Sequence, residues 1–446
     1  MTSRFPHPLA LLTGCILAAA LGSYVLTAGE YDRQKDPVTG RNVVVAGTYH
    51  TVERRPVGPF QALVAIPQGL AEAGSVVFLV FLVGGAFTVV DKTGALRQAV
   101  GWLVRRIESR EALVIPIISL TFAAGGALEN MSEEIIALVP VLLLVTRQLG
   151  FDAITAVAIS IGAAAVGAAF SPINPFQAQI AQKLAGLPLL SAAGFRSVVM
   201  VLAVALWIWG TWRHAMRTRR PPEDGERGAG AHLDRRGISV LFLVILAFAV
   251  FLYGVLQLGW DFDQMSALFF AMGVLAGLAG GLGVSGTAQA FVTGFADMAY
   301  AGMLIGFARA IFVVLDRGRI IDTVVHGLTA PLQSLPVVVS AIGMELVQAA
   351  LHGPVPSVSG QAVLTMPVLV PMSDLIGLSR QVTVLAFQYG AGLTEMVTPT
   401  NGALMAVTAA MSVRYDEWIG FALPLYGALL LLGAVALVVA IAVGLR

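Results

Sequence analysis

Long apolar runs separated by short polar segments dominate the chain. A transmembrane helix needs about 20 apolar residues to cross a hydrocarbon core of about 30 Å. We therefore expect helices near 8–28, 75–91, 153–184, 195–212, 238–257, 264–284, 302–315, 380–412 and 418–444. Four further segments look interfacial rather than spanning, namely 60–73, 94–109, 286–300 and 317–331. The pattern predicts an all-α polytopic membrane protein.

Two stretches, 111–147 and 332–373, do not fit single spans. Each consists of two apolar arms of about 15 residues around a tip that is polar or contains proline and glycine. Such arms are too short to cross the hydrocarbon core, so we expect two re-entrant hairpins. Each hairpin precedes a long apolar segment, 153–184 or 380–412, which a proline motif interrupts. We therefore expect two broken helices, with their breaks at 171–175 and 398–402.

The polar interruptions recur at one spacing of 227 residues. Ser132 matches Ser359, and Asn174 matches Asn401. The other matched pairs include Gly126/Gly353, Pro140/Pro367, Gly150/Gly377 and Pro172/Pro399. Helix breakers and polar groups at matched places in two apolar halves are typical of transporters with internal repeats, whose binding site lies at mid-membrane depth.

The basic residues predict how the two halves are oriented. Arginines cluster in the linker 213–237, which places this linker in the cytoplasm. The helix 238–257 has no counterpart in the first half, so this additional crossing inverts the second repeat. We expect a first transmembrane helix with a cytoplasmic N-terminus and an external loop (1–59), repeat 1 (60–212), the linker (213–237), a connecting helix (238–257) and repeat 2 (264–446).

The overall composition agrees with a membrane transporter and excludes other classes. Of 446 residues, 57% are hydrophobic and 12% are charged, about half the charged fraction of a soluble domain. The net charge of +1 and the absence of a long basic run argue against a nucleic-acid partner. The single cysteine, Cys15, excludes an internal disulfide. The residues before it resemble a lipoprotein cleavage box, but the apolar run continues beyond it, which favours a retained transmembrane helix.

The first hairpin tip is acidic. It contains Glu129, Glu133 and Glu134, together with Asn130 and Ser132. One carboxylate at the bilayer centre costs about 3 kcal/mol, so three of them imply water, cations or a partner. A pocket that recognises an amine or binds protons is one interpretation. Capping of the second arm by Asn130 with Glu133, or a plain loop between two spans, are the structural alternatives.

The second hairpin tip has no charge. Ser357, Ser359 and Gly360 provide hydroxyl groups and the exposed N–H groups of a half-helix, which suit a carboxylate. The structural alternative is that a serine only caps the arm. Because one tip favours cations and the other favours a carboxylate, a basic amino acid is the favoured substrate.

The broken helices add further candidate ligands. Hydroxyl and amide oxygens together with freed backbone carbonyls are able to bind Na⁺, and the candidates are Ser171, Asn174, Thr398 and Asn401. The alternative is that Pro172 and Pro399 only kink these helices.

Three further polar residues lie within apolar segments. Glu395, close to the second break, is a candidate for binding an amine or a proton, and His352 is a candidate proton switch. Arg309 needs an acidic or carbonyl partner, and either a substrate carboxylate or a structural ion pair satisfies this need.

Several motifs resemble one known family. They are Pro56-Val57-Gly58-Pro59-Phe60, Val83-Gly84-Gly85-Ala86-Phe87, Met131-Ser132-Glu133-Glu134, Asn174-Pro175-Phe176, Ser357-Val358-Ser359-Gly360-Gln361-Ala362 and Pro399-Thr400-Asn401-Gly402. Together they resemble the YfcC-type carriers of the C4-dicarboxylate anaerobic carrier-like family, in the ion transporter superfamily. The chain departs from this branch at Leu128-Glu129-Asn130, where smaller uncharged residues are usual, at Glu395, where an amide is usual, and at Ala391, where an acid is common.

The resemblance implies an inverted-repeat homodimer in the bacterial inner membrane, with a scaffold domain and a moving transport domain that work as an elevator. It implies transport of a basic amino acid in the nearer branch and of a C4-dicarboxylate in the broader family, by antiport or with an ion gradient. The expected coupling ion is Na⁺ or H⁺, with no other cofactor. An intramembrane serine hydrolase built on Ser359 and His352, or a passive channel, is a remote alternative.

Overall fold

The computed structural model describes residues 8–35, 42–95, 98, 111–129, 131–132, 134–220, 234–258, 260 and 262–445. Among these residues, six helices are long and apolar enough to cross a membrane. They are Gly74–Lys92, Ala153–Leu184, Ala193–Thr218, Phe262–Ala279, Gly283–Arg317 and Tyr415–Ala442. The described part of the chain is helical apart from short β-ladders in one loop, so the predicted all-α class is confirmed.

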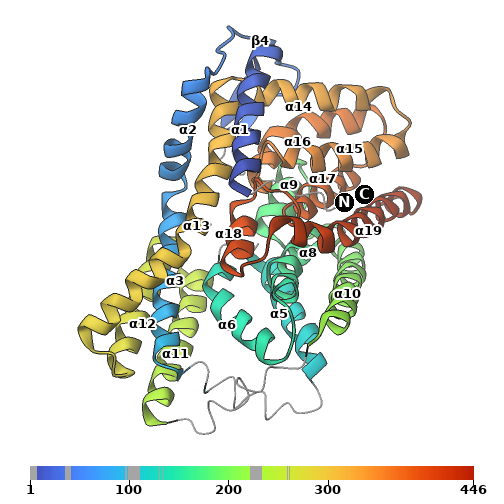
Figure 1. Cartoon of the computed structure of the whole chain (residues 1–446). Helices are drawn as coiled ribbons and strands as arrows, with labels where there is room; N and C mark the ends of the chain where they lie inside the picture. The colour runs from blue at the N-terminus through green and yellow to red at the C-terminus, as the bar shows by residue number, and fades with distance from the viewer. Residues whose placement is uncertain are drawn as a thin grey trace.

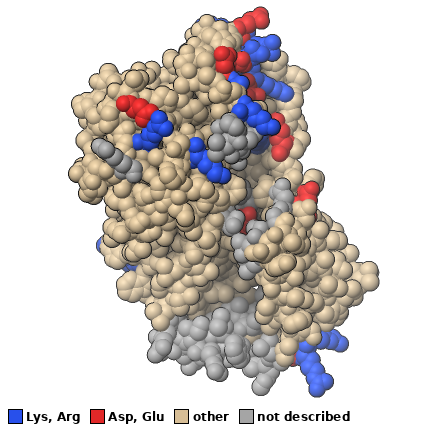
Figure 2. All heavy atoms as spheres, turned by 180° about the vertical axis from the view of Figure 1, so that it is seen from behind, with Lys and Arg blue, Asp and Glu red and all other residues tan. Residues whose placement is uncertain are grey.

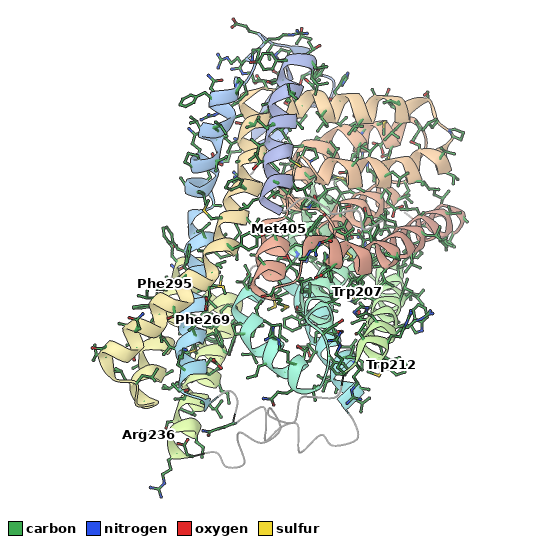
Figure 3. All side chains as sticks on the ribbon, viewed as in Figure 1. Trp207, Trp212, Arg236, Phe269, Phe295 and Met405 are labelled. Atoms are coloured by element: carbon green, nitrogen blue, oxygen red, sulfur yellow. The ribbon has the colours of Figure 1, made fainter. Side chains whose placement is uncertain are left out.

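One group of helices, here called the column bundle, occupies the left and upper centre of Figure 1. It consists of α1 (Pro8–Val25), α2 (Pro59–Glu72), α3 (Gly74–Lys92), α11 (Arg235–Leu258), α12 (Phe262–Ala279) and α13 (Gly283–Arg317). The α2 and α3 helices form a column along α13 (Figure 1). Phe87, Phe248 and Phe269 pack together with ring centroids 5.5 to 6.2 Å apart, and Figure 3 labels Phe269 on α12 and Phe295 on α13 within this bundle.

The long helix α13 corrects one expectation. We expected an interfacial segment at 286–300 and a separate span at 302–315, and this is wrong because both belong to one helix of 35 residues. At 1.5 Å per residue, α13 is about 52 Å long, which exceeds the hydrocarbon core. The segment 60–73 is not separate either, since only Ala73 divides α2 from α3. Gly69 lets α2 approach α13, because a Cβ there would lie 2.4 Å from the Gly306 carbonyl oxygen.

The remaining helices form the hairpin bundle. Its first half contains η1 (Glu111–Leu113), α5 (Val114–Glu129), α6 (Glu134–Gln148), α7 (Ala153–Val157), η2 (Ala158–Gly162), α8 (Ala163–Phe170), η3 (Pro175–Gln179), α9 (Ile180–Leu184) and α10 (Ala193–Thr218). Its second half contains α14 (Ile321–Thr329), η4 (Ala330–Ser334), α15 (Val337–His352), α16 (Val358–Leu375), α17 (Arg380–Thr394), α18 (Gly402–Ala410) and α19 (Tyr415–Ala442). In Figure 1, the α5–α6 pair lies in the lower half and the α15–α16 pair lies in the upper half.

Matched residues of the two halves adopt matched local structures. Gly150 and Gly377 both have a positive φ, 80° and 74°, in the turn that follows the second arm of each helix pair. Asn174 and Asn401 are both N-caps after a helix break. The segment 94–109, which we expected to be interfacial, lies mostly outside the described residues.

Two buried tryptophans support the broken helices from α10 and α19. The indole N–H of Trp207, labelled in Figure 3, donates to the Ala158 carbonyl oxygen at 2.9 Å, where η2 forms a π-helical turn. The indole N–H of Trp418 donates to the Met396 carbonyl oxygen at 2.8 Å, within the second break. These bonds satisfy backbone groups that the irregular segments leave unpaired.

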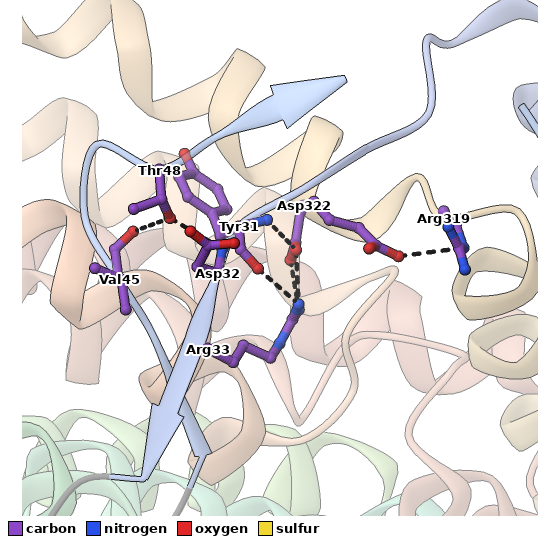
Figure 4. Close-up of polar contacts among 8 residues, drawn as sticks. Tyr31, Asp32, Arg33, Val45, Thr48, Arg319 and Asp322 are labelled. Carbon is purple, nitrogen blue, oxygen red and sulfur yellow. Dashed lines mark hydrogen bonds and ion pairs between the residues drawn. The ribbon is translucent and has the colours of Figure 1, made fainter. Parts of the chain in front are cut away.

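The loop between α1 and α2 contains two short antiparallel ladders. They are β1 (Gly29–Glu30) with β4 (His50–Thr51), and β2 (Arg33–Lys35) with β3 (Asn42–Val44). Asp322 of α14 accepts the N–H of Tyr31 and pairs with Arg33, both at 2.9 Å (Figure 4). Burial and the neighbouring Asp322 raise the pKa of Tyr31 to about 12. The loop is therefore fixed to α14.

Charged side chains gather toward the two ends of the molecule. Figure 2 shows most of the Lys, Arg, Asp and Glu side chains of one face near its upper and lower ends, with few across its middle. The loop after α1 lies at the upper end of Figure 1, and Arg236 lies at the lower end of α11 in Figure 3. Such a distribution leaves an apolar belt that a lipid bilayer can surround.

Candidate functional site

The first broken helix is closed by hydrogen bonds to the first hairpin. The Asn174 side-chain amide donates to the Gly126 carbonyl oxygen at 2.8 Å and also accepts two backbone N–H groups of η3. Ser171 Oγ donates to the Ala127 carbonyl oxygen at 2.8 Å. Both side chains are fully buried. The polar atoms of this break therefore bind the end of α5.

The second broken helix is bonded to the second hairpin in a similar way. Asn401 caps α18 by accepting a backbone N–H at 3.1 Å. The hydroxyl groups of Thr398 and Thr400 are 2.9 Å apart, and Thr400 donates to the Gly353 carbonyl oxygen at 2.7 Å. Both predicted breaks are therefore present, and each is fixed to the hairpin that precedes it.

The two breaks lie next to each other. A Cβ on Gly392 of α17 would lie 3.0 Å from the Cα of Ala169 on α8, so the two broken helices are in close contact. The amide of Gln177, just after the first break, lies 3.4 Å from a carboxylate oxygen of Glu395, just before the second. Glu395, an acidic residue of the second half, therefore lies where the two halves meet.

A cavity of about 370 Å³ lies between the column bundle and the second break. Its lining includes Glu72, Ala73, Val76, Ser132, Ile305, Ala308, Arg309, Pro356, Glu395, Thr400, Asn401, Gly402 and Ala403. Arg309 and Glu72 form an ion pair at 2.9 Å, with side chains that are 42% and 46% exposed. The predicted acidic partner of Arg309 is therefore Glu72, and a small solute in the cavity can reach both groups. The volume lies in the usual range for a small-molecule site.

The first hairpin tip contributes Ser132 to this cavity. The backbone N–H of Ser132 donates to the Glu134 carboxylate at 3.1 Å. Asn130 and Glu133, together with the side chain of Glu129, lie outside the described residues. The predicted acidic pocket at this tip therefore stays a prediction.

The second hairpin tip lines a neighbouring cavity of about 500 Å³ under the loop after α1. Ser357 and Gly360 belong to its lining, and Ser357 Oγ accepts the Gly360 N–H at 3.2 Å as the N-cap of α16. Arg309 and Pro356 line both cavities, which are therefore adjacent. Ser359 lines neither of them.

His352 is fully buried and lies away from both cavity linings. Its Nδ1 lies 3.1 Å from the side-chain oxygen of Gln361, and the side-chain amide of Gln361 donates a hydrogen bond to the side-chain oxygen of Gln348. Among the described residues, His352 has no hydrogen bond to Ser359, so the pair that a serine hydrolase needs is not assembled.

Sequence analysis missed Glu72. It ends α2, and it faces Arg309 only because α2 packs against α13. One signal was present: Gly69/Gly294, Glu72/Asp297 and Asp91/Asp316 share one spacing of 225 residues. An acid repeated inside a matched pair of apolar helices is a functional candidate.

Comparisons with known proteins decide the family. The model of the C4-dicarboxylate anaerobic carrier family (DcuC) matches residues 5–442. The chain belongs to this family. The family that the motifs predicted is thus confirmed. Members of the C4-dicarboxylate anaerobic carrier family are transporters, so the chain is a secondary transporter in the membrane and not an enzyme.

Two relatives of this carrier family cover most of the chain. An Escherichia coli (strain K12) protein named "Putative basic amino acid antiporter YfcC" is 30% identical over 97% of this chain and 96% of its own length. A Haemophilus influenzae (strain Rd) protein named "Uncharacterized protein" is 29% identical over 90% of this chain and 82% of its own length.

Two solved transporter structures are also similar over nearly the whole chain. The Alcanivorax borkumensis YdaH transporter is 20% identical, with a TM-score of 0.44 over 98% of this chain and 99% of that one. Neisseria gonorrhoeae MtrF is 16% identical, with a TM-score of 0.41 over 98% and 95%.

Proposed function

We propose that this secondary transporter carries a basic amino acid through the cavity of about 370 Å³. The observation that carries this proposal is that one guanidinium, from Arg309, and two carboxylates, from Glu72 and Glu395, line the same cavity. A basic amino acid has one carboxylate and two cationic groups, so its charges complement all three side chains. The relative named as a basic amino acid antiporter supports the same substrate class.

The charges of the cavity also discriminate against the alternative substrate. A C4-dicarboxylate has two negative groups, and it meets one arginine and two like-charged carboxylates in this cavity. Like charges in a partly desolvated site are repulsive and reject such a ligand. Glu72 pairs with Arg309 in the structure, and in this proposal the substrate carboxylate replaces Glu72 there while Glu72 turns to an ammonium group of the substrate.

Other residues complete the proposed site. Ser132 and Asn401 contribute polar groups to the same lining. The acidic first tip, with Glu129, Glu133 and Glu134 beside Asn130, attracts the cationic substrate. Ser357 and Gly360 receive a carboxylate in the adjacent cavity, which serves as an approach to the site. Thr398, Ser171 and Asn174 hold the breaks in place through the hydrogen bonds described above.

The cavity lies between the column bundle and the hairpin bundle, which supports an elevator. In this proposal the column bundle is the scaffold and the hairpin bundle moves with the substrate. The arginines at the ends of α10 and α11 support a cytoplasmic linker and a cytoplasmic N-terminus, by the positive-inside rule. Membership of the family supports a homodimer in the bacterial inner membrane that works by antiport or with Na⁺ or H⁺.

Uptake into proteoliposomes tests the substrate. Purified protein is reconstituted, and uptake of labelled arginine, lysine, ornithine and succinate is compared. We expect uptake of the three amino acids and none of succinate. Uptake of succinate alone would show that the dicarboxylate alternative is correct.

Variants of the cavity test the site. We expect Arg309→Gln and Glu395→Gln to raise the KM for arginine about tenfold or more, since each removes a charged hydrogen bond. Glu53→Gln, in the exposed loop after α1, is the matched control and leaves uptake unchanged. If both cavity variants kept the wild-type KM for arginine, this cavity would be excluded as the substrate site.

A further inference from the structure

Glu345 is a buried carboxyl group that the proposed substrate site does not use. It lies on α15, its exposed fraction is 1%, and its Oε1 has no hydrogen-bond partner among the described residues. Two other helices enclose it. A Cβ on Gly390 of α17 would lie 2.1 Å from the Glu345 carbonyl oxygen, and one on Gly433 of α19 would lie 2.3 Å from Oε1. An isolated ionised carboxylate is very unfavourable in such a place, so the group holds a cation.

The space around Glu345 fits a proton and not a metal ion. The Cβ position of Gly433 lies 2.3 Å from Glu345 Oε1 and 3.2 Å from the ring of Tyr389, so backbone and ring close over the carboxyl group. A hard metal cation needs a shell of several oxygen ligands. Among the described residues, Glu345 belongs to no group of three or more histidine, cysteine or acidic side chains that could hold a metal ion.

A buried cation also lies near Tyr389. Arg196 of α10 is fully buried, and its guanidinium donates to the side-chain oxygens of Gln388 and Gln381. Its Nε has no partner among the described residues. Tyr389 is within electrostatic range of both Arg196 and Glu345. Arg196 and Glu345 thus act on the same phenol from two different helices.

The glutamine that binds Arg196 also forms a hydrogen bond to the first break. Gln388, which accepts from Arg196, donates to the Ser171 carbonyl oxygen at 2.7 Å, where α8 ends. A change in the charge of Glu345 that draws Arg196 away from Gln388 alters the support of this break. The Arg196 side chain is thus connected, through Gln388, to the place where the two broken helices meet.

We propose that Glu345 carries the proton that is coupled to substrate transport, and that Arg196 stabilises the carboxylate after the proton has left. The proton binds a carboxylate oxygen from one aqueous side and leaves to the other, with no covalent change in the substrate. The titratable groups near Glu345 are Tyr389 from α17 and Tyr426 from α19, and the charged Arg196 of α10 lies near Tyr389. On α15 itself, His352 lies two turns away and bonds Gln361. This inference rests on the proposed transport of a basic amino acid.

Transport in proteoliposomes tests the coupling. Labelled arginine is offered with and without a pH gradient to the wild type, to Glu345→Gln and to the control Glu53→Gln. We expect Glu345→Gln to lose gradient-driven accumulation completely while exchange of internal for external arginine continues at the wild-type rate. Gradient-driven accumulation by Glu345→Gln at the wild-type level would overturn the proposal.

Infrared spectroscopy tests the proton without any transport. A carbonyl band of a protonated carboxylic acid is expected in the wild type at neutral pH. The band should disappear in Glu345→Gln and persist at a shifted frequency in Glu345→Asp, which keeps the carboxyl group and serves if Glu345→Gln does not fold. The absence of any change in this band would overturn the proposal. If arginine is not transported at all, the proposed substrate is wrong, and the infrared result alone still decides the role of Glu345.

Discussion

The first and second breaks carry the same asparagine at the same place in the repeat, but their surroundings differ. Asn174 is fully buried and makes one hydrogen bond to the first hairpin and two to η3. Asn401 makes one cap hydrogen bond, of 3.1 Å, and lines the cavity between the bundles. The first break is thus a structural joint, in which buried hydrogen bonds fix the helix to the hairpin. The second break instead lines a cavity that a solute can enter.

The two breaks also differ in whether an acidic residue precedes them. Glu395 precedes the second break and lines the cavity, whereas the equivalent position of the first half is Ala168, which is buried. A repeat therefore provides two places where unwound backbone is available, and only one of them needs to be used for binding. The pair of asparagines provides the most direct way to test this division.

The largest difference is expected between Asn174→Ala and Asn401→Ala. The first substitution removes three hydrogen bonds in a buried site and should lower the free energy of unfolding by about 3 kcal/mol. The second removes one cap bond and should lower it by about 1 kcal/mol. Thermal unfolding in detergent, followed by tryptophan fluorescence, measures both.

For transport activity, we expect the order of the two variants to be reversed. Per folded molecule, Asn401→Ala should reduce arginine uptake more than Asn174→Ala, because only Asn401 lines the cavity. Equal losses of stability, together with equal losses of uptake, would contradict the division between a joint and a binding break.

Much of the fold was predictable because its signals are local. The hairpins and breaks follow from arm lengths and from prolines and polar residues such as Ser171 and Thr398. The continuous helix α13 was not predicted, since its glycines allow close packing against α2 and α3 and do not mark a break. The division between Asn174 and Asn401 was not predictable either. The same asparagine in two similar motifs has a different role because the rest of the chain packs differently against each of them.

A second test compares Gly126 with its counterpart Gly353. A Cβ on Gly126 would lie 2.0 Å from the Ala164 carbonyl oxygen, so Gly126→Ala forces α5 away from α8. We expect a loss of about 2 kcal/mol in the free energy of unfolding. A Cβ on Gly353 would lie 3.5 Å from the Ala350 carbonyl oxygen, which is ordinary contact, so Gly353→Ala should cost less than about 0.5 kcal/mol. Similar costs would show that the two hairpins are packed alike.

A third test uses the charge at the start of each broken helix. Asp152 caps α7 and Ser379, its counterpart, caps α17. Burial raises the pKa of Asp152, but hydrogen bonds from His214 and Thr155 outweigh this and lower it to about 2. Because the folded pKa is depressed, this stabilisation is present above pH 4 and is lost as the pH falls toward 2.

Asp152→Asn should therefore reduce stability by about 1.5 kcal/mol at pH 6 and by much less at pH 2. The matched variant Ser379→Asn replaces one neutral cap by another and should show no dependence on pH. Unfolding temperatures measured in detergent across this pH range compare the two. A constant difference between Asp152→Asn and the wild type at all pH values would exclude the ionised carboxylate as its cause.

The smallest expected effect separates the two matched serines of the hairpin tips. Ser132 lines the cavity between the bundles, whereas Ser359 lines neither described cavity. Loss of one neutral hydrogen bond to the substrate is worth about 1 kcal/mol, so Ser132→Ala should raise the KM for arginine about fivefold. Ser359→Ala should leave the KM unchanged, and neither variant should alter the unfolding temperature. A raised KM in Ser359→Ala alone would move the binding site from the first tip to the second, where only the second hairpin and the loop above it surround the solute.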